Sequence, residues 1–155
     1  MPMKGAMKRS EPLSRLLSSS QEMEDLGKEL GRIVSTPAVI AFHGDLGAGK
    51  TTFIKGLVCG AALVSSREVN SPTFTYLNIY IGTKEIYHFD LYRLKGSEDF
   101  LVMGFDEYFN KGICCIEWAE RIPDLLPPGS IHIHIQSLGE TKRKITISSN
   151  RGASL

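Results

Sequence analysis

The sequence has few cysteines, no long apolar run and almost no net charge, and each shortage excludes a class of protein. Three cysteines in 155 residues, none in a CxxC pattern, do not make a disulfide framework. They favour reduced thiols and a cytoplasmic location. No apolar run approaches the roughly 20 residues of a membrane span, so we expect no membrane association. Eighteen basic and 17 acidic side chains give a net charge of +1, which argues against direct binding to DNA.

The remaining composition is that of an ordinary globular domain, with 42% hydrophobic and 23% charged residues. A chain of this length buries enough surface to fold without a disulfide or metal. Residues 1–18 are rich in basic side chains and contain a single acidic one. We therefore expect a basic, flexible tail over 1–18, one domain over 19–150, and a short tail over 151–155.

The first half of the domain is predicted to run from a helix through a strand to a second helix. Ser19 and Glu22 have the spacing of a capping box, and apolar residues follow on one helical face. Residues 38–42 form an apolar run typical of a buried strand. After a glycine-rich turn, a helix is expected over 51–59, with Gly60 placed to end it.

The second half alternates at period two, which predicts strands and hairpins. Gly104 is expected to interrupt its helix. The expected elements are strands over 73–80 and 84–94 with a turn at 81–83, a helix over 97–110, a strand over 113–116, and a hairpin of 131–136 with 144–148. The fold class is therefore α/β. We expect a three-layer fold of the P-loop NTPase kind, with a mixed sheet that includes antiparallel hairpins.

The segment 44–51, GDLGAGKT, matches the phosphate-binding pattern G-x-x-x-x-G-K-[ST] at every fixed position. Glycines let backbone amides approach phosphate oxygens closely, and the following helix presents its unpaired N-terminal amides to the same anion. Lys50 supplies a charge for the outer phosphates, and the Thr51 hydroxyl is a ligand for Mg²⁺. The pattern lies between a predicted strand and a predicted helix, which favours nucleotide binding over a chance glycine-rich turn. The expected nucleotide-binding residues are Asp45, Leu46, Gly47, Ala48, Gly49, Lys50, Thr51 and Thr52.

The metal also needs an acidic residue, and two residues qualify. Asp90 and Glu117 each end a hydrophobic strand. Glu117 has the cleaner apolar run before it, whereas Asp90 shares a strand face with His88. A surface acid at a strand end is the alternative for either residue.

Four blocks give the chain a resemblance to the TsaE (YjeE) family, the small ATPases of tRNA threonylcarbamoyladenosine biosynthesis. The blocks are GDLGAGKTT at 44–52, SPTF at 71–74, HFDLYRL at 88–94 and IEW at 116–118. The resemblance runs from about Ser19 to the final hairpin. The sequence departs from the family's pattern in Met23, where Thr is frequent, in Ala119, where Pro is frequent, and in its basic tail.

The resemblance implies a Mg²⁺-dependent ATPase that binds ATP or ADP and is slow on its own. It implies that TsaB and TsaD are partners in placing a threonylcarbamoyl group on the adenosine next to the anticodon of tRNAs reading ANN codons. The resemblance further implies that TsaD performs the transfer, that the ATPase cycle resets the complex, and that tRNA is reached through that complex.

The resemblance also implies roles for individual residues. Thr51 and Glu117 map onto the Mg²⁺ site, Asp90 maps onto the acid needed for hydrolysis, and 71–74 maps onto a switch-like loop.

The residues themselves leave some of these roles open. Hydrolysis needs an oriented water and positive charge on the transition state, for which Asp90 and Lys50 are the candidates. Asp45 is an alternative candidate for orienting the attacking water, although a role in capping or ordering the loop suits it better. Thr73 is a candidate sensor of the γ-phosphate, or simply the residue that enters a strand after Pro72.

Five further features have structural and functional readings. Trp118 is expected either to stack on a partner or a base or to be half-buried in the core. Arg93 is expected to form an ion pair with Asp90 or Glu98 or to donate charge internally. His132 and His134 share a strand face without a third metal ligand, so we expect no metal there. The 114–115 cysteine pair is expected to pack in a buried strand. Residues 142–144, Lys-Arg-Lys, are a solvated turn or a contact with the nucleotide, a partner or tRNA.

Other P-loop functions fit less well. A metabolite kinase usually has an arginine-rich lid, and no such cluster is present. A GTPase would need an NKxD sequence, but Asn110-Lys111 is followed by Gly and Ile. A non-catalytic adaptor would not need both Asp90 and Glu117.

Overall fold

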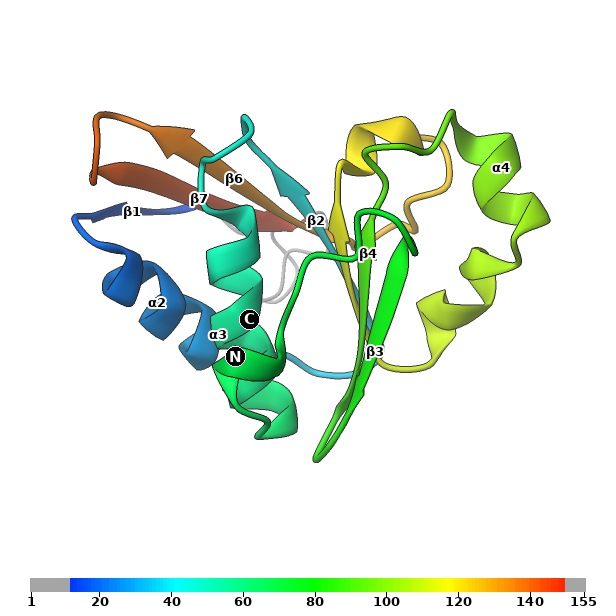
Figure 1. Ribbon diagram of the computed structural model, residues 1–155, viewed down its shortest axis with the longest axis horizontal. Coiled ribbons are helices and arrows are strands. Elements are labelled where there is room, and N and C mark those ends of the chain that lie inside the picture. Colours follow the sequence, from blue (N-terminus) through cyan, green and yellow to red (C-terminus); the bar gives the residue numbers. More distant parts are fainter. Residues whose placement is uncertain (1–11, 150–155) are drawn as a thin grey trace, which may run out of the picture.

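A seven-stranded mixed sheet forms the centre of the computed structural model, which describes residues 12–149 (Figure 1). Its strands lie in the order β1-β7-β6-β2-β5-β4-β3. They are β1 Leu13–Leu17, β2 Ala38–His43, β3 Leu77–Ile81, β4 Glu85–Asp90, β5 Ile113–Glu117, β6 Ile131–Ser137 and β7 Arg143–Ser149. The inner strands β6, β2, β5 and β4 are parallel, and both edges are antiparallel.

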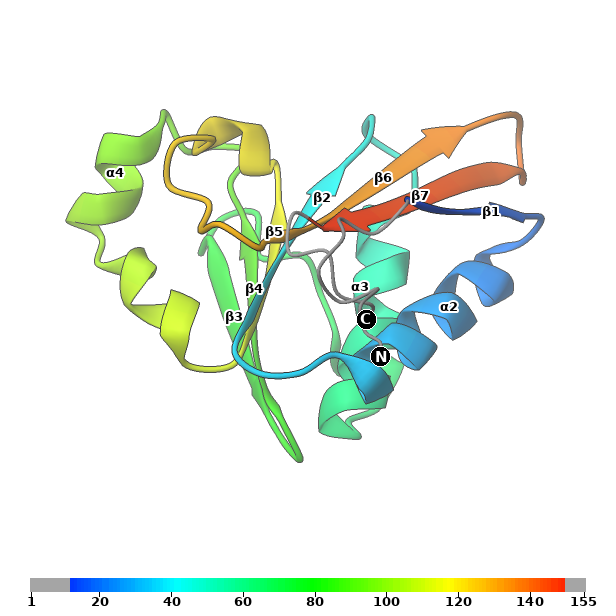
Figure 2. The same ribbon diagram turned by 180° about the vertical axis from the view of Figure 1, so that it is seen from behind.

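Helices cover both faces of this sheet. They are α2 Ser20–Ile33, α3 Lys50–Ala62 and α4 Ser97–Val102, with 3₁₀ turns η1 Ser66–Glu68, η2 Phe105–Asn110 and η3 Ala119–Arg121. The first two pack on one face, and α4 with η2 lies on the other, as Figures 1 and 2 show from opposite sides. The predicted three-layer α/β fold with a mixed sheet is confirmed.

The alternation of strand residues explains the two cores. In β2, Ile40 and Phe42 belong to the core beneath α2 and α3, whereas Val39 and Ala41 belong to the core beneath α4. Successive side chains of a strand point to opposite faces, so a strand that is apolar at every position must be covered on both faces. The central strands therefore bring their carboxyl ends to one edge of a sheet that is buried on both sides.

The cap of α2 agrees with the sequence pattern. Ser19 Oγ accepts a hydrogen bond of 3.1 Å from the Glu22 amide, and Glu22 Oε1 accepts one of 2.6 Å from the Ser18 amide. The return bond of the capping box thus reaches Ser18, one residue before the cap itself.

The expectation of a flexible tail over 1–18 is wrong for its last part. Leu13–Leu17 form β1, which pairs antiparallel with β7, and Leu17 is buried. Basic and polar residues suit an edge strand whose other side faces solvent, so composition alone did not distinguish this strand from a tail. Residues 1–11 of the expected tail, and residues 151–155, lie outside the described residues.

Other boundaries also differ. The strand expected over 84–94 covers only Glu85–Asp90. Gly60 does not end its helix, because α3 continues to Ala62 and the chain turns at Leu63 with φ 63°. The strand expected over 73–80 begins only at Leu77, since Tyr76 has φ 69° and its amide donates to the Pro72 carbonyl. The segment before it is a turn. Within residues 12–149, no helix combines the length and the apolar character needed to cross a membrane.

Candidate nucleotide site

The glycine-rich loop joins the end of β2 to the start of α3. Gly44, Gly47 and Gly49 have φ of 152°, 82° and 112°, which residues with a Cβ rarely adopt. The loop is closed by a 3.0 Å hydrogen bond from the Ala48 amide to the Asp45 carbonyl. The first amides of α3 therefore lie at the end of the loop, in the arrangement that binds anions in proteins.

Lys50 begins α3 and is almost completely buried, at 5% exposed. Its ammonium group donates to the Gly44 carbonyl and lies 4.4 Å from the centre of the Trp118 ring. These contacts keep the charge at the mouth of the loop, and no carboxylate among residues 12–149 forms an ion pair with it. Such a charge is available for an anionic ligand.

A cleft of about 420 Å³ opens beside the loop. Its lining combines the loop, the start of α3, the ends of two parallel strands and the segment before β3. The lining residues are Leu46, Gly47, Gly49, Lys50, Thr51, Thr52, Ser71, Thr73, Asp90, Tyr92, Glu117 and Trp118. Residues from four separate parts of the chain thus converge on one site.

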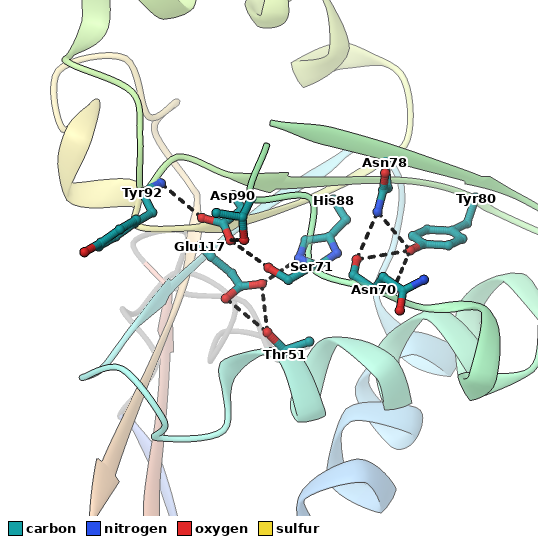
Figure 3. A network of polar contacts seen from close by, with 10 residues as sticks. Thr51, Asn70, Ser71, Asn78, Tyr80, His88, Asp90, Tyr92 and Glu117 are labelled. Carbon is teal, nitrogen blue, oxygen red and sulfur yellow. Dashed lines mark hydrogen bonds and ion pairs between the residues drawn. The ribbon is translucent and has the colours of Figure 1, made fainter. Parts of the chain in front are cut away.

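Glu117 ends β5 and faces the start of α3 (Figure 3). Its carboxylate oxygens lie 3.2 and 3.3 Å from the Thr51 hydroxyl, and Oε2 lies 2.7 Å from His88 Nε2. His88 is fully buried in β4 and so fixes the direction in which Glu117 points. A buried carboxylate is tolerated because it has these partners.

Asp90 ends β4 and is paired in register with Glu117 across the sheet. Its Oδ2 accepts hydrogen bonds from Ser71 Oγ at 2.7 Å and Thr73 Oγ1 at 3.1 Å, and its Oδ1 accepts one from the Tyr92 amide at 3.0 Å. Figure 3 shows Ser71 pointing at this carboxylate. Asp90 therefore ties the 71–73 segment to the edge of the sheet.

The structure brings together most of the residues that the sequence predicts for the site, with two exceptions. Ala48 is buried although it is part of the loop, and Asp45 lines a different cavity with His43 and His134. The alternative in which Asp45 orients a water in the cleft is therefore not supported by its position.

The other predicted features turn out as follows. The guanidinium of Arg93 lies 4.4 Å from the Phe74 ring centre, and the structure shows no ion pair for it among residues 12–149. Trp118 is partly buried and contacts Tyr92 as well as Lys50.

The remaining predicted features concern cysteines and histidines. The two adjacent cysteines pack in the core as expected, and burial raises the pKa of Cys114 to about 12. His132 and His134 stack on His43. Within the described part of the chain, no three His, Cys, Asp or Glu residues form a metal cluster.

Three residues that matter here carried weak signals in the sequence. Ser71 lies in the SPTF block and His88 in the strand that ends at Asp90, so both were visible without a stated role. Arg143 donates from Nε to the Ala48 carbonyl at 2.9 Å, across 95 residues of sequence. No local pattern could have indicated that contact.

The hydroxyl and carboxylate oxygens near the loop fit Mg²⁺ better than a softer metal. Mg²⁺ prefers oxygen ligands and is usually bound by one or two carboxylates together with substrate phosphates. Thr51 and Glu117 supply such oxygens within hydrogen-bond distance of each other. When bound there, the ion would neutralise phosphate charge.

Comparisons with known proteins agree with this geometry. The family model "Threonylcarbamoyl adenosine biosynthesis protein TsaE" matches residues 17–145. TsaE of Treponema pallidum (strain Nichols) is 39% identical over 131 residues, covering 84% of this chain and 96% of that one. TsaE of Bacillus subtilis (strain 168) is 40% identical, covering 83% and 80%.

A solved structure is similar over nearly the whole chain. The crystal structure of Bacillus subtilis YdiB superposes with a TM-score of 0.74 at 32% identity, covering 90% of this chain and 86% of that one. The phosphate-binding loop, the paired acids at the sheet edge and these matches lead to one conclusion: the chain belongs to the TsaE family.

Proposed function

We propose that this protein is a Mg²⁺-dependent ATPase that acts in the formation of threonylcarbamoyladenosine in tRNA. The observation that carries the proposal is the convergence of Lys50, Thr51, Asp90 and Glu117 on one cleft beside a phosphate-binding loop. The relatives are named for this pathway.

The triphosphate is proposed to lie in the larger cleft, with the nucleoside in a smaller cavity on the other side of the loop. That cavity has a volume of about 190 Å³ and shares Gly47, Gly49 and Thr52 with the cleft. Its other lining comes from the start of α2 and from the β6–β7 turn, and includes Met23 and Arg143. Met23 supplies an apolar surface that suits a base.

Each polar side chain in the cleft has a proposed part in hydrolysis. Lys50 binds the outer phosphates, and Thr51 with Glu117 holds Mg²⁺. Asp90 orients or deprotonates the attacking water, and Thr73 senses the γ-phosphate through its hydroxyl. Because Ser71 and Thr73 both donate to Asp90, the acid and the sensing segment are connected. A change in that segment would therefore reach the acid directly.

The proposal includes partners and a purpose for the hydrolysis. TsaB and TsaD are the proposed partners, tRNA is reached through their complex in the cytoplasm, and ATP hydrolysis resets the complex between turnovers. Low activity of the isolated protein fits the site, because Asp90 is occupied by three hydrogen bonds from its own chain.

Phosphate release from ATP with Mg²⁺, measured with and without TsaB and TsaD, tests this proposal. We expect slow release that the partners accelerate. Asp90→Asn should lower turnover by about 10²–10⁴-fold, as loss of a general base does, with ADP affinity changed little. Thr51→Ala should lower Mg²⁺-dependent turnover more than nucleotide affinity.

Lys50→Ala should weaken nucleotide binding severely, whereas Lys55→Ala, which removes a lysine from the same helix, should behave as the parent. If Asp90→Asn and Glu117→Gln bound ATP normally and supported undiminished multi-turnover tRNA modification, the proposed role of hydrolysis would be wrong. Transfer of phosphate to a small metabolite would instead indicate a kinase.

A further inference from the structure

We infer that Arg143 is a positioning residue for the nucleotide site, because it holds the phosphate-binding loop in its anion-binding conformation from β7, two strands away from β2. The inference rests on the proposed nucleotide binding. Arg143 lies in the Lys-Arg-Lys segment that the sequence leaves without a function. The structure separates its members, because Lys142 and Lys144 are exposed whereas Arg143 turns inward.

The contact with the loop is specific. Arg143 Nε donates 2.9 Å to the carbonyl of Ala48, a residue that is 1% exposed. A carbonyl at such a residue would lose its only described partner without the guanidinium, and a buried unpaired acceptor is costly.

Three other carbonyls around the loop have partners that are near in sequence. The Asp45 carbonyl accepts from the Ala48 amide and the Gly49 carbonyl accepts from Phe53, both within the loop and its helix. The Gly44 carbonyl accepts from Lys50. Ala48 alone among these four depends on a distant element.

Peptide geometry connects this contact to the ligand. In a planar trans peptide, the carbonyl of one residue and the amide of the next point in opposite directions. Holding the Ala48 carbonyl toward β7 therefore directs the Gly49 amide away from β7. Gly49 lines the cleft, and backbone amides of such loops bind the α- and β-phosphates.

The guanidinium is held firmly enough to act in this way. Its Nη1 donates 2.9 Å to both the Gly139 and the Lys142 carbonyls in the β6–β7 turn. Its backbone lies in β7, paired with Leu17 on one side and Ser137 on the other. The planar fork of arginine suits simultaneous contacts of this kind, which a lysine cannot reproduce.

Titration calorimetry of ADP and ATP with Mg²⁺ tests the inference on Arg143→Ala, Arg143→Lys and Lys142→Ala. Lys142→Ala is the control, because it removes one positive charge from the same turn. We expect Arg143→Ala to weaken ADP and ATP by the same factor, about tenfold or more, as loss of a charged hydrogen bond implies. Arg143→Lys should be intermediate, and Lys142→Ala should bind as the parent.

Two further readouts separate positioning from a loss of stability. Steady-state hydrolysis should show KM raised by the same factor with kcat little changed, because phosphate contacts shared by ground and transition states affect binding uniformly. Amide hydrogen exchange should quicken at 44–52 in Arg143→Ala and remain at the parent rate there in Lys142→Ala.

If folded Arg143→Ala bound nucleotide with the parent's affinity, the inference would be overturned. An equal loss of affinity in Lys142→Ala would also overturn it, since the loss of a positive charge alone would then explain the weaker binding. Should Arg143→Ala not fold, Arg143→Lys decides the matter, and full parent affinity in it overturns the inference. If the parent itself bound no nucleotide, the proposed function would fail, while the exchange comparison would still test the role of Arg143.

Discussion

At the scale of single residues, Asp90 and Glu117 are two acids on adjacent strands that have different hydrogen-bond partners. Both are 4% exposed, and they are direct neighbours in register. Glu117 contacts Thr51 at the start of α3, whereas Asp90 contacts the segment before β3. Their hydrogen-bond partners therefore place Glu117 near the phosphate-binding loop and Asp90 near the 71–73 segment.

His43, the last residue of β2, also has an unusual environment. Its Nε2 lies 3.0 Å from His132 Nδ1, and its ring stacks on His134. Burial, followed by the effect of His134 and His132 and then Lys50, lowers the pKa of His43 to about 4, against the opposing effect of Glu120. The folded protein therefore disfavours the protonated ring.

This shift predicts how stability depends on pH. Between about pH 6.5 and 4 the unfolded chain binds a proton at His43 that the folded chain does not, so stability falls as pH falls through this range. Thermal unfolding at steps from pH 7 to 4.5 should show a smaller loss of Tm, by a few degrees, for His43→Asn than for the parent. Parallel curves for the two proteins would contradict the assignment.

At the scale of secondary-structure elements, four glycines allow α2 and α3 to pack closely against each other. Gly27 and Gly31 on α2 and Gly56 and Gly60 on α3 are each so close to the other helix that an added Cβ would lie 1.9–2.2 Å from a backbone oxygen. The two backbones are thus in direct contact. This explains why Gly60, expected to end its helix, lies inside it.

Gly60→Ala should therefore destabilise the protein although alanine favours helices. In an exposed helix the change gains about 0.5–1 kcal/mol. Here the new methyl group would overlap the Lys28 carbonyl, and overpacking of this kind costs about 1–3 kcal/mol. Chemical denaturation would measure the difference. Gly96→Ala serves as a control, because its backbone is extended and the nearest atom lies 3.9 Å away. A more stable Gly60→Ala protein would show that the helices separate easily.

Strand β1 allows a matched pair of substitutions. Leu17 is 8% exposed and belongs to the core, whereas its neighbour Leu16 is 74% exposed. Leu17→Ala should cost about 2 kcal/mol or more, as loss of a buried leucine does, and Leu16→Ala should stay within about 0.5 kcal/mol. Urea unfolding of both variants tests this. Equal effects would mean that β1 does not contribute to the folded domain.

At the scale of the whole molecule, the parallel strands bring their carboxyl ends to the edge where the loop lies. Ligands of open α/β sheets bind outside these ends. Binding there joins α3, which belongs to one core, to β4 and β5, which contribute to both cores. A nucleotide should therefore stabilise the entire domain and not the loop alone.

ADP with Mg²⁺ at a hundredfold excess over its Kd should raise the free energy of unfolding by about 2.7 kcal/mol. For a chain of this size that is a rise in Tm of roughly 5–11 °C. Thermal scans should show the rise in the parent and in Lys55→Ala and its loss in Lys50→Ala. A rise that persisted in Lys50→Ala would place the nucleotide elsewhere.

Much of the site was predictable because its chemistry is local in the chain. The phosphate-binding loop depends on eight consecutive residues whose backbone freedom and helix start act together, and Asp90 and Glu117 follow strands that are recognisable by their apolar runs. The 71–76 turn was missed because its shape depends on Asp90, which is almost twenty residues away. Strand β1 was missed because its pairing with β7 joins opposite ends of the domain.

The sequence by itself determined the loop, the two strands that end at the acids, and the family to which they point, since each is encoded in short, contiguous patterns. Only the tertiary structure showed that His88 orients Glu117, that Ser71 and Thr73 donate to Asp90, and that Arg143 contacts the loop. The physical reason is that side-chain hydrogen bonds are short-ranged in space but not in sequence, so contacts such as that of Arg143 with Ala48 exist only once the sheet has formed.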